Sequence, residues 1–156
     1  MSLLSEILTT LANWLKGELQ IIAILAALYT LGFALTGVPA WFLLGPVCAL
    51  LHLVPIFGAP LGLILVLAAT ALAGRSFPQI LAALAVWVLV EALEGFYLTP
   101  RILGKRTRLG PMAVFFGVIA ASALFGPVGI FFAVPTMAVA MVIYHYFNRA
   151  RTSAVK

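Results

Sequence analysis

The chain has very few charged residues, no aspartate and a single cysteine. Only 8% of its 156 residues are charged, whereas 65% are hydrophobic, and the mean hydropathy is +1.22. A soluble domain carries about 25% charged residues. The composition therefore excludes an ordinary soluble domain and indicates an integral membrane protein of one domain.

The missing residue types and motifs exclude several further classes. Cys48 has no second cysteine with which to form an internal disulfide, and its apolar neighbours predict an inert thiol. A chain without aspartate is not a two-aspartate intramembrane protease. It contains no His-Glu-x-x-His zinc motif, no Gly-x-Ser-x-Gly nucleophile and no phosphate-binding loop. We expect no enzymatic activity and no cofactor, apart from Na⁺ or H⁺ as a coupling ion.

The positions of the charged residues predict how the chain is oriented in the membrane. Nine basic and four acidic residues give a net charge of +5, but the basic residues lie in loops between apolar segments. There they set orientation or contact anionic lipid headgroups, so nucleic acid is not the expected partner. The basic loop at 99–111 and the tail at 148–156 predict cytoplasmic N- and C-termini. The first residues lack a basic leader, so no cleavable signal is expected.

Two long apolar stretches, residues 39–74 and 112–147, are each interrupted in the middle by glycine and proline. The first is broken by PIFGAP and the second by GPVG, and each break follows an apolar arm of about 14 residues. A membrane-spanning helix needs roughly 20 residues. Paired and interrupted short segments are the best sequence indication of a carrier's binding site. We predict two re-entrant helical hairpins, hairpin 1 and hairpin 2.

The remaining segments complete an all-α integral membrane protein. Residues 3–16 have the pattern of an amphipathic helix on the membrane surface, or alternatively of a helix packed on the rest of the protein. Residues 19–36 and 79–98 are long enough to span the bilayer fully. In this layout the hairpins insert from opposite sides, which makes the two halves an inverted repeat. An ordinary six-span protein, with hairpins that cross completely, has the same end topology.

Two carboxylates on the second span are candidates for binding a solute or ion. Glu91 and Glu94 are three residues apart, so they share one helix face. A carboxylate inside a span costs about 2.5–3.5 kcal/mol and usually faces protein or water. Burial and mutual repulsion favour proton uptake, and paired oxygens suit a hard cation such as Na⁺. The alternative for Glu94 is an interfacial position, paired with Arg101 or Lys105.

The hairpin tips and one histidine are the other candidates. Gly58 and Pro60 lie in the first tip, and Gly126 and Gly129 lie in the second. Backbone carbonyls freed at such breaks can coordinate a cation, and helix N-termini can face a polar solute. The alternative is two tight turns at the membrane surface. His52 is able to relay protons or bind a substrate, or it is simply satisfied by a backbone carbonyl or a neighbouring polar group.

Three stretches resemble the AI-2E family, whose members are also called autoinducer-2 exporter-like proteins. They are residues 14–51 before and into hairpin 1, residues 50–64 around its tip, and residues 94–135. The third stretch carries the most specific pattern, an acidic residue, a proline, a Gly-Lys turn, Leu-x-Pro, a Gly-x-x-Gly tip and a closing Ala-Val-Pro. Its members are Glu94, Pro100, Gly104-Lys105, Leu109-Gly110-Pro111, Gly126-Pro127-Val128-Gly129 and Ala133-Val134-Pro135.

The resemblance implies a multipass inner-membrane protein that forms homo-oligomers and works as an elevator-type carrier. Relatives are linked to export of autoinducer-2-like molecules, and some are described as sodium or lithium/proton antiporters. The expected substrate is thus a small polar solute or a monovalent cation, bound between the hairpin tips near Glu91, Glu94 and His52. The chain resembles only the C-terminal half of family members. The alternative is therefore a non-transporting scaffold or subunit whose partner supplies the N-terminal half.

Overall fold

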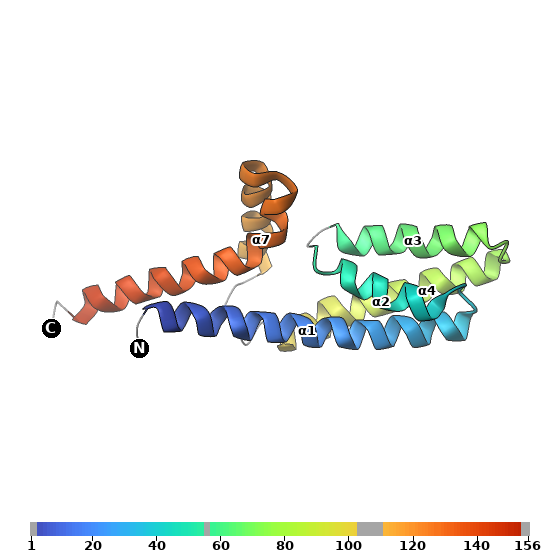
Figure 1. The fold of residues 1–156 in the computed structure, drawn as a ribbon, viewed down its shortest axis with the longest axis horizontal. Coiled ribbons are helices and arrows are strands. Elements are labelled where there is room, and N and C mark those ends of the chain that lie inside the picture. The colour runs from blue at the N-terminus through green and yellow to red at the C-terminus, as the bar shows by residue number, and fades with distance from the viewer. Residues whose placement is uncertain (1–2, 55–56, 103–110, 154–156) are drawn as a thin grey trace. The chain divides into compact units, whose positions relative to one another are not determined.

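The structure is a computed structural model that describes residues 3–54, 57–102 and 111–153, and none of these residues lies in a strand. The chain divides into two compact units. One, the Glu18–Arg101 unit, is continuous, and the other, the α7 unit, combines Met1–Gly17 with Ile102–Lys156. The elements (Figure 1) are α1 (Leu3–Thr36), α2 (Trp41–Leu51), α3 (Gly58–Leu72), α4 (Phe77–Leu93), the π-helix η1 (Glu94–Leu98), α5 (Thr99–Ile102) and α7 (Pro111–Ser153).

Two stretches are long and apolar enough to cross a membrane, Leu3–Thr36 and Phe77–Leu98. This confirms the prediction of an all-helical chain with two helices able to span. The predicted ranges 3–16 and 19–36 are parts of one uninterrupted helix of 34 residues. At 1.5 Å per residue α1 is about 51 Å long, which exceeds a hydrocarbon core of roughly 30 Å. A surface position for residues 3–16 agrees with that length and stays a prediction.

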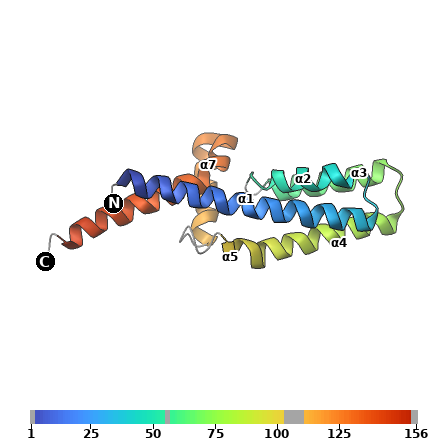
Figure 2. The same cartoon turned by 60° about the horizontal axis from the view of Figure 1, so that its bottom comes forward.

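Helices α1 to α4 run side by side in the Glu18–Arg101 unit (Figure 2), with α3 packed against both α2 and α4. Glycine lets α1 approach its neighbours closely. A Cβ atom at Gly45 of α2 would lie 2.6 Å from the backbone nitrogen of Thr30, and one at Gly32 would lie 2.4 Å from Cγ1 of Val86 on α4. The fully buried side chains in this unit include Leu25, Tyr29, Phe33, Val38, Cys48, Val66 and Thr70.

Hairpin 1 is formed by two short helices, α2 of 11 residues and α3 of 15 residues. Neither reaches the roughly 20 residues of a full span. Gly58 begins α3 directly against the end of α2, because a Cβ atom there would lie 1.9 Å from the carbonyl oxygen of Leu51. The predicted helix–turn–helix is therefore present. Its re-entrant insertion into a bilayer stays a prediction.

Helix α7 of the other unit folds back on itself at Gly126, whose φ of 62° and ψ of −145° interrupt the helical backbone (Figure 1). Glycine adopts such a conformation without the steric cost of a Cβ atom. The two arms then approach closely. Cβ atoms at Gly117 and Gly129 would lie 1.8 Å from the sulfur of Met137 and 2.0 Å from the carbonyl oxygen of Ala121. Hairpin 2 thus turns at the predicted tip, while the inverted repeat stays a prediction.

Candidate functional site

Three side chains from three helices meet at one carboxylate oxygen in the Glu18–Arg101 unit. Oε1 of Glu91 on α4 accepts a hydrogen bond of 2.5 Å from the hydroxyl of Tyr29 on α1. The same oxygen lies 2.8 Å from Nε2 of His52, at the end of α2. The side chains of His52 and Glu91 are only 12% and 20% exposed. Tyr29, His52 and Glu91 form the Glu91 cluster.

The local sequence explains why these groups face inward. On α1, the apolar residues Ile22, Leu25 and Phe33 recur at helical spacing with Tyr29 and are all buried. Tyr29 stacks on Phe33, with 5.3 Å between ring centroids, so its hydroxyl is held at the level of Glu91. A tyrosine offers an apolar body for this packing and a polar tip for the carboxylate.

The geometry of His52 fixes how many protons the His52–Glu91 pair holds. Nδ1 lies 3.0 Å from the carbonyl oxygen of Cys48. A carbonyl only accepts, so Nδ1 carries a proton. At 2.8 Å, Nε2 and Oε1 then share one further proton, either as imidazolium and carboxylate or as imidazole and carboxylic acid. Without that proton two lone pairs would face each other, so the pair binds one exchangeable proton.

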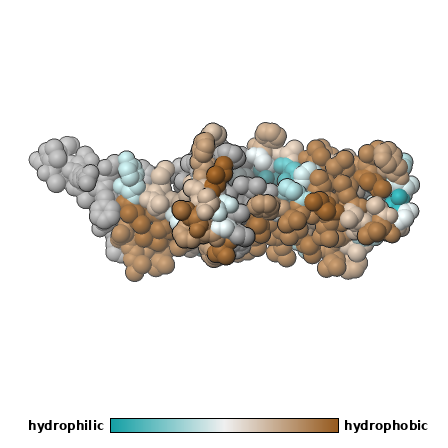
Figure 3. All heavy atoms as spheres, turned by 90° about the horizontal axis from the view of Figure 1, so that it is seen from above, coloured by the Kyte–Doolittle hydropathy of each residue, from teal (hydrophilic) through white to brown (hydrophobic). Residues whose placement is uncertain are grey.

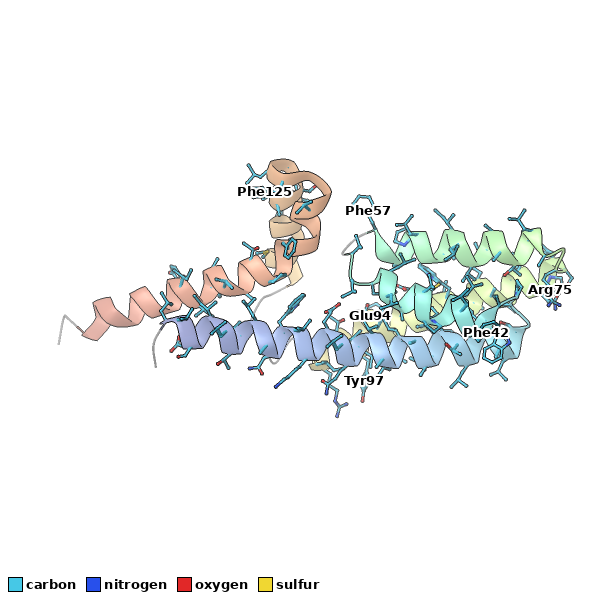
Figure 4. All side chains as sticks on the ribbon, in the orientation of Figure 1. Phe42, Phe57, Arg75, Glu94, Tyr97 and Phe125 are labelled. Atoms are coloured by element: carbon cyan, nitrogen blue, oxygen red, sulfur yellow. The ribbon has the colours of Figure 1, made fainter. Side chains whose placement is uncertain are left out.

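Glu94 lies one turn beyond Glu91 but has other partners. Its Oε1 accepts a hydrogen bond from the hydroxyl of Thr99. Arg101 does not pair with it among the described contacts. The guanidinium instead donates to the hydroxyl of Tyr97 and lies 5.0 Å from the centroid of that ring. Figure 4 shows Glu94 and Tyr97 on different sides of the helix. Lys105, the other suggested partner, lies outside the described residues.

The hairpin tips contribute close packing, and no described contact joins them to Glu91. Gly58 is buried, and Pro60 is exposed in the first turn of α3, a position that proline tolerates because its missing N–H has no helical partner there. Gly126 and Gly129 belong to the α7 unit. A role for these four residues in binding stays a prediction.

Sequence reasoning missed Tyr29 and Thr99. The signal for Tyr29 was a lone hydroxyl in the middle of an otherwise apolar span, since a polar group there needs a partner inside the protein. Two buried polar atoms of the described chain have no partner, Oγ1 of Thr30 and Nε1 of Trp87. Trp87 lies one helical turn before Glu91, and Thr30 follows Tyr29. No group of three or more histidine, cysteine or acidic side chains that suits a metal ion occurs among the described residues.

Comparison with known proteins gives a consistent result. A family model described as AI-2E family transporter matches residues 1–149. "Putative transport protein YrrI" of Bacillus subtilis is 28% identical over 151 residues, which cover 96% of this chain and 42% of the relative. "Putative transport protein YueF" of the same organism is 29% identical over 146 residues, which cover 92% of this chain and 38% of the relative.

A third relative comes from a cyanobacterium. "Putative transport protein sll0063" of Synechocystis is 31% identical over 124 residues, which cover 80% of this chain and 31% of the relative. The chain therefore spans about two fifths, or less, of the length of the curated relatives that it matches.

Proposed function

Because the chain belongs to the AI-2E family of transporters, we propose that it exchanges a monovalent cation for a proton at the Glu91 cluster. The observation that carries this proposal is the single proton shared by His52 and Glu91 at 2.8 Å, fixed by the bond of His52 Nδ1 to the Cys48 carbonyl. In a transporter, a buried group that binds one proton is able to couple proton movement to the movement of a substrate.

The chemistry of the exchange follows from the proton count. In the protonated state, Nε2 and Oε1 are joined by a hydrogen bond and no ion fits between them. When the proton leaves to water, His52 keeps the proton on Nδ1 and becomes neutral, and Glu91 is a carboxylate. A cation such as Na⁺ then replaces the proton beside the carboxylate, so one positive charge is exchanged for another. Proton and cation exclude each other because both need Oε1.

The ligands suit an alkali cation. Hard cations prefer oxygen ligands, and the cluster offers the carboxylate of Glu91 and the hydroxyl oxygen of Tyr29. A small polar solute is the second kind of substrate that the family suggests, and it would bind through hydrogen bonds to the same groups. We further propose an inner-membrane protein with cytoplasmic termini that works as a homo-oligomer, with hairpins 1 and 2 re-entrant in the bilayer.

The test is sodium-driven proton movement in proteoliposomes. The 156-residue chain is reconstituted with an internal pH dye, and sodium chloride is added outside. We expect the internal pH to rise as sodium enters and protons leave. Glu91→Gln should abolish the response, since an amide neither binds the exchanged proton nor compensates the cation charge.

Glu6→Gln is the matched control. It removes a carboxylate from the α7 unit, which does not contain the Glu91 cluster, and should leave the response unchanged. A folded, oriented chain that gives no pH change would reject sodium/proton exchange. Uptake of a labelled polar solute would then identify an uncoupled carrier. Activity only in the presence of a second membrane protein would identify the alternative, a subunit that needs a partner.

A further inference from the structure

We infer that Glu18 and Glu94 form the access route to the Glu91 cluster, so that water and ions reach it from the α5 end of the Glu18–Arg101 unit and not from the Arg75 end. The identity of the ions that use the route rests on the proposed function. The route itself is a property of the packing and has a separate test.

Acidic side chains continue from the Glu91 cluster toward the α5 end. Glu94 begins η1 one helical turn after Glu91, on the side of α5, where its charge also acts on His52 and Tyr29. Glu18, on the buried face of α1 that also carries Tyr29, interacts with Glu94 and with His52. Both acidic residues are partly exposed. Partly exposed carboxylates from α1 and η1 therefore lie near the cluster on its α5 side, and they are the geometric basis of the proposed route.

Glu94 is held in place by a local distortion of the helix. Residues Glu94–Leu98 form a π-helix, and Thr99 binds Glu94 twice, since its backbone N–H donates to the Glu94 carbonyl and its hydroxyl donates to the Glu94 carboxylate. A π-turn is rare inside an α-helix and is frequently found at a functional site. Glu94 and Tyr97 leave this turn on different sides (Figure 4), and Arg101 is bonded to Tyr97.

The opposite end of the unit is sealed by apolar packing. Phe33 follows Tyr29 in α1 and Ala83 precedes Glu91 in α4, and both are completely buried, as is Val66 in α3. Val38, after the end of α1, is 2% exposed. The one buried polar residue among those described, Thr70, has its hydroxyl bonded to the Val66 carbonyl of its own helix. Among the described residues, no hydrogen bond between side chains leads from the cluster toward that end.

The distribution of hydrophilic residues on the surface agrees with a route at the α5 end. The face of the unit in Figure 3 is almost entirely hydrophobic, but it carries a hydrophilic patch toward the end where Glu94 lies in Figure 4. The other hydrophilic spheres of this unit lie at the extreme Arg75 end. A hydrophilic patch within an apolar surface is expected where a buried ionisable group communicates with water.

Cysteine accessibility tests the route without any transport measurement. In a Cys48→Ala background, single cysteines are introduced as Glu18→Cys, Glu94→Cys and Ala83→Cys, in sealed vesicles of known orientation. A charged, membrane-impermeant methanethiosulfonate reagent modifies only thiols that meet water. We expect modification at positions 18 and 94, only from the membrane face to which an Arg101→Cys variant reacts, and none at position 83.

Leu93→Cys is the matched control. It neighbours Glu94 on α4, but Leu93 is 41% exposed on the apolar outside, so a lipid-facing thiol there should not react. Equal reaction at 93 and 94 would show general exposure rather than a route. Reaction at 83, or protection at 18 and 94, would overturn the inference. These outcomes do not depend on sodium/proton exchange, so the access route and the proposed function fail separately.

A kinetic measurement distinguishes a relay from a structural role. Glu94→Gln should slow the initial rate of the sodium-evoked pH change about 100-fold, at the lower end of the usual contribution of a proton-transfer group. The sodium concentration that gives half the maximal response should change little, because Glu91 and Tyr29 remain. Glu94→Asp should restore much of the rate. Loss of sodium response at every concentration in both variants would instead place Glu94 in the binding site.

Discussion

Oε1 of Glu91 has two hydrogen-bonding partners, His52 and Tyr29, and they contribute differently. In the proposed mechanism, the pair with His52 holds the exchangeable proton, whereas the Tyr29 hydroxyl donates a hydrogen bond to Glu91 whether or not that proton is bound. A hydrogen bond to a charged group contributes about 1.5–3 kcal/mol. The arrangement therefore separates the residue that titrates with Glu91 from the residue that positions it.

Tyr29→Phe tests that separation. The ring and its stacking on Phe33 remain, but Oε1 of Glu91 loses one donor and one potential cation ligand. We expect a lower thermal stability in detergent and a weaker apparent affinity for sodium, with proton binding retained. Tyr97→Phe, at an exposed tyrosine bonded to Arg101, should change neither. Equal effects of the two substitutions would contradict a specific role of Tyr29.

Two threonines with buried hydroxyl groups provide a paired test of polar burial. The hydroxyl of Thr70 donates to the Val66 carbonyl at 2.7 Å, whereas that of Thr30 has no partner. Valine has nearly the same shape. Thr70→Val should destabilise the chain by about 1 kcal/mol, and Thr30→Val should be neutral or stabilising by a similar amount. Thermal unfolding of the two variants in the same detergent measures both changes in stability. A large loss of stability in Thr30→Val would show that the Thr30 hydroxyl has a function.

At the scale of helices, glycine decides how closely α1, α2 and α4 approach. Gly45 faces the backbone of Thr30, which has no freedom to move, whereas Gly32 faces the side chain of Val86. This close packing of the helices allows the side chains of Tyr29 and His52 to reach Oε1 of Glu91. The cluster depends on these contacts as much as on its own side chains.

Gly45→Ala should separate α1 from α2 and cost about 1–3 kcal/mol, as overpacking of a tight contact does. Gly95→Ala is the control, because no atom lies within 4 Å of a Cβ there and alanine favours a helix. Stability in detergent should fall only for the first variant. Unchanged stability of Gly45→Ala would mean that α2 moves freely against α1.

At the scale of the whole molecule, Phe77–Leu98 comprises 22 residues, or about 33 Å at 1.5 Å per residue. That length matches a hydrocarbon core of roughly 30 Å. The residues before and after this stretch should therefore lie on opposite faces of the membrane.

The prediction is testable in a Cys48→Ala background with Ala73→Cys and Arg101→Cys. The two thiols should react with an impermeant reagent from opposite sides, with position 101 on the cytoplasmic side. Reaction of both from the same side would show that Phe77–Leu98 does not cross and would overturn the topology.

The sequence by itself determined the class and three interruptions of the helices, although it divided α1, which is one continuous helix, into two segments. Hydropathy, helix periodicity and the conformations of glycine and proline are properties of neighbouring residues, so the breaks before Trp41 and at Gly58 and Gly126 were readable from the chain. The carboxylates of Glu91 and Glu94 stood out because charge is rare in an apolar span.

Only the tertiary structure decided which groups meet. Tyr29 and Glu91 are 62 positions apart, and His52 reaches Glu91 from a third helix. The spacing of Glu91 and Glu94 suggested one shared site, yet a π-turn and Thr99 give Glu94 its own environment. Such pairings depend on helix rotation and on backbone approach at Gly32 and Gly45, which are set by the packing of distant segments and have no local signature.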